Sequence, residues 1–423
     1  MTAIDWAVLA LTIAAIVAYG TFRVRIETMD GFLRGGADLR FWTIGLSIIA
    51  TQASAITFLS TPGQAYEDGM GFVQFYFGLP IAMVILAAVI VPIYHRLEIY
   101  TAYEYLEARF DRKTRQLTAF LFLIQRGLSI GLSIYAPAIV LSAVLGWSAH
   151  STNLVLGTVT ILYTVAGGSR AVSRTQTLQM AVIFCGMVAA MGYVIWRLPP
   201  EVPFGGAVTI AGTLGKLHVI DTSFDLDKRY TLASGLIGGL FLSLAYFGTD
   251  QSQVQRYLSG SPLAESRLGL LMTGLVKIPM QLFILFVGVM VFVFYQLTPP
   301  PLFFRDADLA RIREAAPAEV ARLESDAARA FADKRAAISS LIAPGGAGDP
   351  AAQAAVRDGE RRMGEVRKGT RALVKRVNPS ADPKDSDYVF IRFVLDHFPH
   401  GLIGLLVAVI LCAAMSSSAG ALS

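Results

Sequence analysis

The sequence predicts an all-α integral membrane protein, and three observations support this fold class. Of the 423 residues, 54% are hydrophobic and only 16% are charged, whereas a soluble globular domain carries about 25% charged residues. Nine segments are apolar over most of the roughly 20 residues that a spanning helix needs. Lysines and arginines are concentrated in alternate loops between these segments, as in multi-pass membrane proteins.

The predicted spanning segments follow one another along most of the sequence, and the fifth of them is short. They cover residues 4–22, 41–66, 72–95, 117–146, 152–167, 175–197, 231–250, 266–296 and 400–423.

The distribution of basic residues predicts how the segments are oriented. The first, third, fifth and seventh loops carry most of the arginines, among them Arg23, Arg112, Arg170 and Arg256. Loops rich in lysine and arginine face the cytoplasm. We therefore predict a multi-pass protein of the cell (inner or plasma) membrane whose N-terminus and long loop 297–396 lie outside.

Composition and motifs argue against several other classes. The net charge of +5 is spread over short loops, so nucleic acid is not an expected partner. Cys185 and Cys412 lie in apolar runs and have neither metal-site nor disulfide spacing. The sequence has no HExxH or P-loop motif and no paired carboxylates within the spans. An enzyme is therefore not expected.

The loop 297–396 differs in kind from the other loops. Residues 306–340 and 351–377 are rich in Ala, Arg, Glu and Asp at helical spacing, and the Gly- and Pro-rich stretch 343–350 separates them. This pattern predicts a solvated helical hairpin outside the membrane. A disordered polar insertion is the alternative.

Two polar stretches interrupt apolar spans and are candidates for a transport pathway. Residues 50–57 are small and polar, so this run can unwind and expose carbonyl groups to an ion; close packing of small residues is the alternative. We expect Pro62–Gly63 to end this segment. Residues 413–418 place serine hydroxyls, ligands suited to a monovalent cation, in the last span. There the alternative is hydrogen bonding of the serines to their own helix.

Four strongly polar residues lie within or at the edges of spans, namely Arg126, Asp250, Gln251 and Lys277. Ionisable groups at membrane depth are functional candidates by default. For Asp250 and Gln251 the alternative is an interfacial position, and for Lys277 it is bonding to carbonyls of a neighbouring helix. Arg126 is deeper, which favours a lined cavity.

The order of segments and four motifs resemble the sodium:solute symporter family, which includes sodium–glucose, proline, iodide, monocarboxylate and sialic acid carriers. The resemblance covers residue 4 to the end without the outside loop. The motifs lie at residues 49–60 with Pro62–Tyr66 and Gly69, at 101–110, at 167–172, and at 249–256.

The resemblance implies a leucine-transporter-like fold, in which two inverted five-helix repeats surround a site at mid-membrane. Residues 1–40 would form a peripheral helix and a cytoplasmic loop, and 41–197 the first repeat. Residues 231–296 would hold the first two helices of the second repeat, before the charged insertion 297–396. The third would lie in 397–423, which leaves this repeat incomplete, so we expect a sequence that is truncated at its C-terminus.

The resemblance also implies a sodium site, with sodium as the coupling ion. Its ligands would be the carbonyls of Ala50 and Ala53 from the broken helix and that of Ala413, with the hydroxyls of Ser416 and Ser417. Many members carry an aspartate where this sequence has Gln176, so we predict one coupled sodium ion and not two.

The resemblance places several residues around a solute. Tyr246 matches the aromatic residue that closes the substrate site from inside in sugar carriers, with Phe247 beside it. Lys277 matches a lysine that helps to bind solute in those carriers. The polar and acidic positions of the sugar carriers are here Gln52, Ile56, Thr57 and Tyr76.

This departure favours the monocarboxylate, vitamin and iodide branch, with Arg126 holding an anionic head group, since guanidinium groups suit bidentate binding of carboxylates. Alanine and lysine replacements at position 126 test that role.

The predicted function is sodium-coupled symport of a small organic solute by alternating access, with a monocarboxylate or other small anion as the candidate solute. The alternatives are a sugar or amino-acid symporter, the sensor module of a symporter-fused histidine kinase, and an inactive fragment. The expected partners are a small-molecule solute and the lipid bilayer.

Overall fold

A computed structural model describes residues 1–22, 39–145, 147–225, 227–260 and 262–422. The basic loop predicted at 23–40 lies almost wholly outside these residues. The described part of the protein is helical, and its only β-type pairing is an isolated bridge between Leu39 and Gly260. The predicted all-α class is confirmed.

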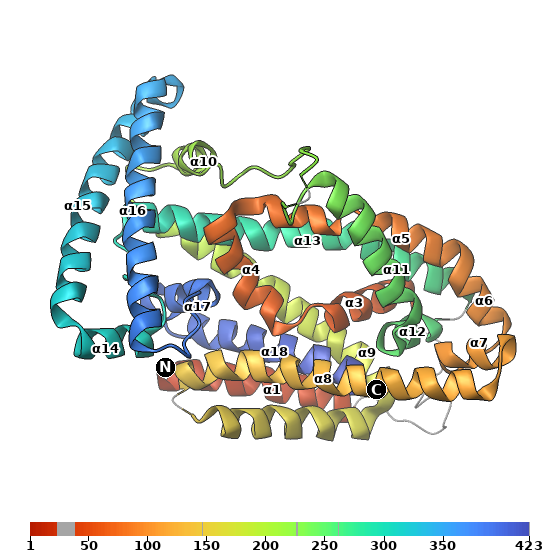
Figure 1. Cartoon of the computed structure of the whole chain (residues 1–423). Coiled ribbons are helices and arrows are strands. Elements are labelled where there is room, and N and C mark those ends of the chain that lie inside the picture. The colour runs from red at the N-terminus through yellow and green to blue at the C-terminus, as the bar shows by residue number, and fades with distance from the viewer. Residues whose placement is uncertain (23–38, 146, 226, 261, 423) are drawn as a thin grey trace.

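The first half of the protein begins with a peripheral helix and a broken helix and continues through short helices to the long helices α8 and α9 (Figure 1). They are α1 (Ala3–Phe22), α3 (Phe41–Gln52), α4 (Ala55–Asp68), the 3-10 helix η2 (Gly69–Tyr76), α5 (Leu79–Ile85), the π-helix η3 (Leu86–Ile90), α6 (Val91–Arg96), α7 (Ala102–Arg109), α8 (Arg112–Leu145) and α9 (Ala149–Trp196).

The second half contains two long apolar helices and a charged helical insertion between them. Its elements are α10 (Phe204–Thr213), the π-helix η4 (Ser234–Gly238), α11 (Gly239–Thr249), α12 (Gln251–Leu258), α13 (Leu263–Leu297), α14 (Asp306–Ala315), α15 (Pro317–Ile342), the 3-10 helix η5 (Gly346–Gly348), α16 (Pro350–Val377), α17 (Ser386–His397) and α18 (Leu402–Leu422).

The described helices confirm a multi-pass membrane protein. By length and composition, five helical segments can cross a bilayer: Ala55–Arg96, Arg112–Tyr135, Ala171–Trp196, Leu263–Leu297 and Leu402–Leu422. Four shorter apolar helices accompany them: Ala3–Tyr19, Phe41–Gln52, Phe204–Thr213 and Ser234–Thr249.

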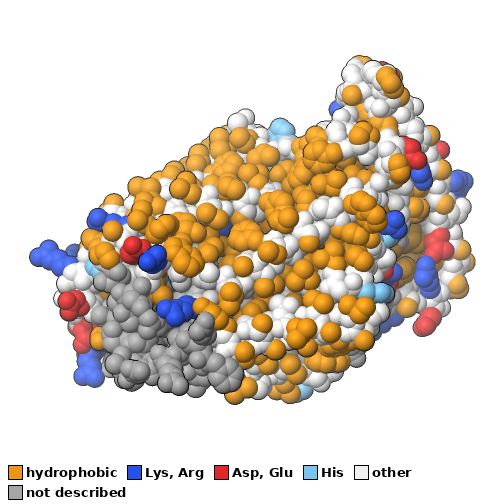
Figure 2. Space-filling model, turned by 180° about the vertical axis from the view of Figure 1, so that it is seen from behind, with side chains coloured by type: hydrophobic (Ala, Val, Ile, Leu, Met, Phe, Trp, Pro, Cys, Tyr) orange, Lys and Arg blue, Asp and Glu red, His pale blue; other side chains and the backbone are white. Residues whose placement is uncertain are grey.

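The outer surface of the helix bundle is apolar. On α8, Leu123 and Leu128 are 66% and 68% exposed, and Leu117 and Leu132 are similarly open. Figure 2 shows hydrophobic side chains spread across the body of the molecule, with charged side chains gathered at its two ends. Such a continuous apolar face is typical of a surface in contact with lipid.

The helix predicted over 41–66 is broken in the middle. Ala53 and Ser54 have extended backbone angles between α3 and α4, so the small polar run does unwind. The expectation that Pro62–Gly63 ends the segment is wrong, because α4 continues through Pro62 to Asp68. A proline inside a helix removes one backbone hydrogen bond. Here the backbone of Pro62 packs closely against Gly288 of α13.

The two spans predicted at 152–167 and 175–197 form the two parts of α9. They meet at a kink at Gly168, whose φ of 53° and ψ of −163° are not helical. Glycine adopts positive φ at little cost because it has no Cβ. Gly168 in the third motif therefore supplies the bend.

The contact between α13 and α4 depends on Gly288. A Cβ atom at this position would lie 2.2 Å from the carbonyl oxygen of Pro62, so no other residue fits without moving the backbone. We expect Gly288→Ala to destabilise the protein by about 1–3 kcal/mol through overpacking. Thermal unfolding of the purified protein in detergent measures this. Gly192→Ala, in α9 with open space around the added methyl group, is the control, and equal unfolding temperatures for the two variants would contradict the prediction.

The insertion forms helices rather than a disordered loop. Helices α15 and α16 pack as a hairpin, with Lys334 Nζ 2.9 Å from Glu360 Oε2 and Arg362 Nη1 3.0 Å from Asp333 Oδ2. The glycine-rich stretch 343–349 joins them, as the sequence indicates. Figure 1 shows the hairpin standing across one end of the bundle, beside α10. Helix α10 was not predicted; its C-terminal Thr213 carbonyl accepts a hydrogen bond from Arg357 Nε at 3.1 Å.

Ion pairs attach the insertion to the end of α4. Arg371 binds Glu67 of α4 and, at 3.0 Å, the carboxylate of Asp385. Arg367 Nη2 lies 3.0 Å from the same Asp385 oxygen, and the other oxygen accepts the Phe304 N–H at 2.9 Å. Asp385 is fully buried, so its negative charge is balanced by the two arginines.

Candidate functional site

The break between α3 and α4 lies against α18. The hydroxyl of Ser416 donates a hydrogen bond to the carbonyl oxygen of Ala50 at 2.9 Å, and both residues are fully buried. These two residues are 366 positions apart in the sequence. The structure thus brings one predicted sodium ligand from each segment into direct contact.

The other three predicted ligands lie on the same two segments. Ala53 and Ala413 are fully buried and Ser417 is half-buried. Among the described residues, no group of three or more His, Cys, Asp or Glu side chains could hold a metal ion. A cation bound in this region would therefore meet neutral carbonyl and hydroxyl oxygens, the ligand type predicted from the sequence.

Gln176 of α9 connects both segments. Its amide nitrogen donates to Thr51 Oγ1 at 2.9 Å and to the Ser416 carbonyl at 3.0 Å, and its amide oxygen accepts from Ser47 Oγ. In the sequence, Gln176 stood out only as the replacement of an acid. Ser47 and Thr51 were not predicted as site residues, although Thr51 belongs to the polar run 50–57.

The predicted solute residues do not all come together. Lys277 of α13 is fully buried, and its Nζ lies 5.4 Å from the centre of the Tyr76 ring on η2. The side-chain oxygen of Gln52 is buried without a hydrogen-bond partner among the described residues. Thr57 is half-buried in the first turn of α4.

One residue near Lys277 was missed. Gln281 follows Lys277 by one helical turn, is fully buried, and leaves both side-chain amide atoms without a partner among the described residues. The i, i+4 spacing of two polar residues in an apolar helix is a signal that could have found it.

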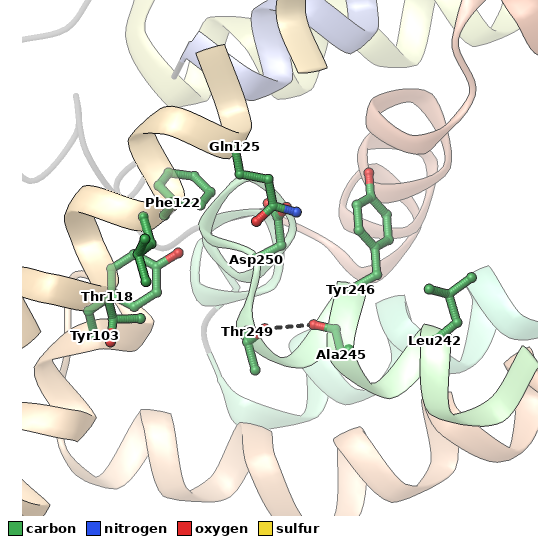
Figure 3. A pocket seen from close by; sticks show the side chains of 10 residues that line it. Tyr103, Thr118, Phe122, Gln125, Leu242, Ala245, Tyr246, Thr249 and Asp250 are labelled. Atoms are coloured by element: carbon green, nitrogen blue, oxygen red, sulfur yellow. Dashed lines mark hydrogen bonds between the residues drawn. The ribbon is translucent and has the colours of Figure 1, made fainter. Parts of the chain in front are cut away.

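A separate cavity of about 360 Å³ lies between α7, α8 and α11 (Figure 3). Phe122 and Gln125 of α8 line it together with Tyr246 of α11 and with Asp250, which directly follows α11. The Tyr246 hydroxyl accepts a hydrogen bond from Gln253 Nε2 at 2.9 Å. Phe247 does not line the cavity; it is buried and packs edge-on against the Tyr246 ring at 5.0 Å.

Arg126 forms an ion pair with Asp250 at the edge of this cavity. The two side chains are 13% and 9% exposed, and the Arg126 guanidinium also lies over the Phe122 ring at 5.7 Å. Asp250 caps α12, since its Oδ1 accepts the Ser252 N–H at 3.0 Å. The positive charge that was predicted to hold an anionic solute therefore has a carboxylate partner within the protein.

Gln251, the neighbour of Asp250, holds α7 in place. Its amide nitrogen donates to the Tyr100 carbonyl at 3.0 Å, and its amide oxygen accepts the Ala102 N–H at 2.9 Å. These bonds to backbone groups give Gln251 a structural role. They also connect the second and fourth motifs of the sequence.

Comparisons with known proteins agree on one family. The model of the sodium:solute symporter family matches residues 32–307. The human sodium/iodide cotransporter is 30% identical over 307 residues, covering 71% of this protein and 47% of the cotransporter. The sodium-coupled monocarboxylate transporter 1 of Xenopus laevis is 33% identical over 254 residues, covering 58% of this protein and 39% of the transporter. The sequence thus spans about half or less of the length of these relatives.

The fold has a close counterpart among solved structures. A Na⁺-coupled sialic acid symporter in a substrate-bound outward-open state superposes with a TM-score of 0.73 at 22% sequence identity. The superposition covers 100% of this protein and 72% of the symporter. The two proteins therefore share a fold.

Proposed function

The protein belongs to the sodium:solute symporter family, and on this premise we propose that it serves sodium-coupled symport of a small organic solute by alternating access. The predicted family and the leucine-transporter-like fold are confirmed. The observation that carries the proposal is the contact between Ser416 of α18 and the Ala50 carbonyl at the break between α3 and α4.

Sodium would bind where this contact lies. The Ala50 carbonyl and the Ser416 hydroxyl oxygen would turn from each other to the ion, with Ala53, Ala413 and Ser417 as further predicted ligands. The ion would then hold α18 and the broken helix together. If solute binding favours the same conformation, the two affinities are mutually enhanced, which is the requirement for coupling. Each sodium ion entering the cell adds about 2.3 kcal/mol per 100 mV of membrane potential.

We propose that the solute is a small anion such as a monocarboxylate. Two relatives are by name carriers of iodide and of monocarboxylates, and the buried Lys277 ammonium has no hydrogen-bond partner among the described residues. Tyr246 lines a cavity on the predicted cytoplasmic side. Its side chain would keep the solute from leaving toward the cytoplasm until that side of the protein opens. A sugar or an amino acid is the alternative.

The sodium dependence of solute binding tests the proposal. The purified protein, in detergent, is incubated with radiolabelled L-lactate, glucose or proline over a range of sodium concentrations, with choline as the replacement cation. We expect lactate binding that requires sodium, with a Hill coefficient near one, because the Gln176 amide is engaged by Ser47, Thr51 and Ser416. A Hill coefficient near two would contradict the prediction of one coupled sodium ion. Binding of glucose or proline in place of lactate would contradict an anionic solute. The absence of any sodium-dependent binding would contradict symport by this protein.

A further inference from the structure

The charge of Lys277 has no counter-ion within the described protein. The side chain is 0% exposed, and its ammonium group makes neither a hydrogen bond nor an ion pair with any described residue. Its electrostatic contact is with the Tyr76 ring, at 5.4 Å. An isolated buried charge is costly unless it is paired, so this position favours an anion supplied from outside the protein. Arg126 differs, since Asp250 already balances it.

Gln281 lies next to Lys277 on the same face of α13. Residues four apart in a helix are neighbours, with Cβ atoms roughly 6 Å apart. Both amide atoms of Gln281 are buried and lack a partner among the described residues, although most buried polar atoms in proteins have one. A hydrogen-bonding group from a solute would satisfy the donor that this side chain offers.

The position of this pair along α13 is fixed by contacts on both sides. Thr273 Oγ1 lies 3.4 Å from the Gly45 carbonyl of α3, and Gly288 packs against Pro62 of α4. These contacts are separated by about four turns of α13, roughly 22 Å, and Lys277 and Gln281 lie between them. The break itself contacts Ser416 of α18. Figure 1 shows α3 and α4 meeting at an angle between α13 and α18. Lys277 and Gln281 follow Thr273 by four and eight residues, so they lie near the face of α13 that contacts the broken helix.

Lys277 is already expected to bind solute from its match to a lysine of the sugar carriers. We propose that Gln281 is a further solute-binding residue beside it, and that the two side chains together hold the carboxylate of the solute. The Lys277 ammonium contacts one carboxylate oxygen, and the Gln281 amide N–H donates to the other. Gln281 is then a specificity-determining residue, because an amide donor beside the ammonium favours a group with two acceptor oxygens. This assignment rests on the proposed symport of a small anion, and it moves the anion partner from Arg126 to α13.

The test compares Gln281→Leu and Gln281→Glu with Gln296→Leu. Gln296 is buried on the same helix about four turns further along, outside the contacts with the break, and serves as the matched control. Binding of radiolabelled L-lactate and of ²²Na⁺ is measured separately on the purified protein. We expect both Gln281 variants to lose about 10- to 100-fold in lactate affinity, the effect of one hydrogen bond to a charged group. The sodium affinity of both Gln281 variants, measured without lactate, should equal that of the wild type. Gln296→Leu should keep the wild-type affinity for both sodium and lactate.

The outcomes separate this assignment from the proposed function. Wild-type affinity for lactate in either Gln281 variant overturns the role of Gln281 and leaves symport standing. If the wild-type protein binds ²²Na⁺ but no lactate, both the proposal of an anionic solute and the assignment of Gln281 are overturned. Gln281→Glu has almost the size of the native residue and adds a like charge to the solute. It therefore tests the assignment even if Gln281→Leu fails to fold, and its failure to repel lactate would count against the proposal.

Discussion

Replacing Ser416 with alanine is expected to weaken sodium binding by about tenfold or more. The substitution removes a hydroxyl that contacts the Ala50 carbonyl, and a polar ligand to a charged group contributes about 1.5–3 kcal/mol. The measurement is a ²²Na⁺ saturation curve on the purified protein. Thermal unfolding of the same sample shows whether the fold is retained, since the lost hydrogen bond itself is worth only about 0.5–1.5 kcal/mol.

Cys412→Ala is the matched control for this variant. Cys412 is also fully buried on α18, one turn before Ser416, and its side chain is not among the predicted ligands. Wild-type sodium affinity in both Ser416→Ala and Cys412→Ala would exclude the Ser416 hydroxyl from the proposed sodium site. Equal losses in both would indicate that any change in α18 disturbs binding.

Replacing Arg126 with alanine is expected to destabilise the protein by about 3–5 kcal/mol. The change leaves the Asp250 carboxylate buried without its partner, which is the costly way to break a buried ion pair. Arg115→Ala is the control on the same helix, because Arg115 and its partner Glu107 are 39% and 38% exposed and exposed pairs contribute about 0–1 kcal/mol. Thermal or SDS-induced unfolding in detergent measures both, and similar losses would refute the structural role of the Arg126–Asp250 pair.

The double variant Arg126→Met with Asp250→Asn separates stability from solute binding. Removing both charges should recover much of the stability that Arg126→Ala loses, because no unpaired carboxylate remains. If this double variant binds L-lactate with unchanged affinity, Arg126 is not the anion partner. A selective loss of lactate binding in a folded double variant would favour Arg126 over Lys277.

Features that depend on short stretches of sequence could be predicted. The spans follow from apolar runs, and the break at Ala53–Ser54 follows from small polar residues that pack weakly within the helix. The helical hairpin follows from the spacing of charged and apolar residues on either side of the stretch 343–350. Each of these features depends on neighbouring residues in the sequence, so it can be predicted without knowledge of tertiary contacts.

Features that depend on contacts between distant segments could not be predicted. Pro62 continues a helix because the glycine at position 288 leaves room for its backbone. Arg126 and Asp250 were both singled out as isolated polar residues, but nothing in the sequence pairs positions 124 residues apart. Gln281 becomes a candidate only once its amide group is seen to lack a partner among the described residues.

The ion pairs between Glu67 and the insertion make the hairpin a lever attached to α4. Helix α15 has 26 residues and is therefore about 40 Å long. If α4 tilts during the proposed transport cycle and the hairpin turns with it as a rigid arm, a rotation of roughly 10° displaces the far end of the hairpin by about 7 Å. A small movement of α4, which begins beside the proposed sodium site, would then appear as a larger displacement in water, at the stretch between α15 and α16.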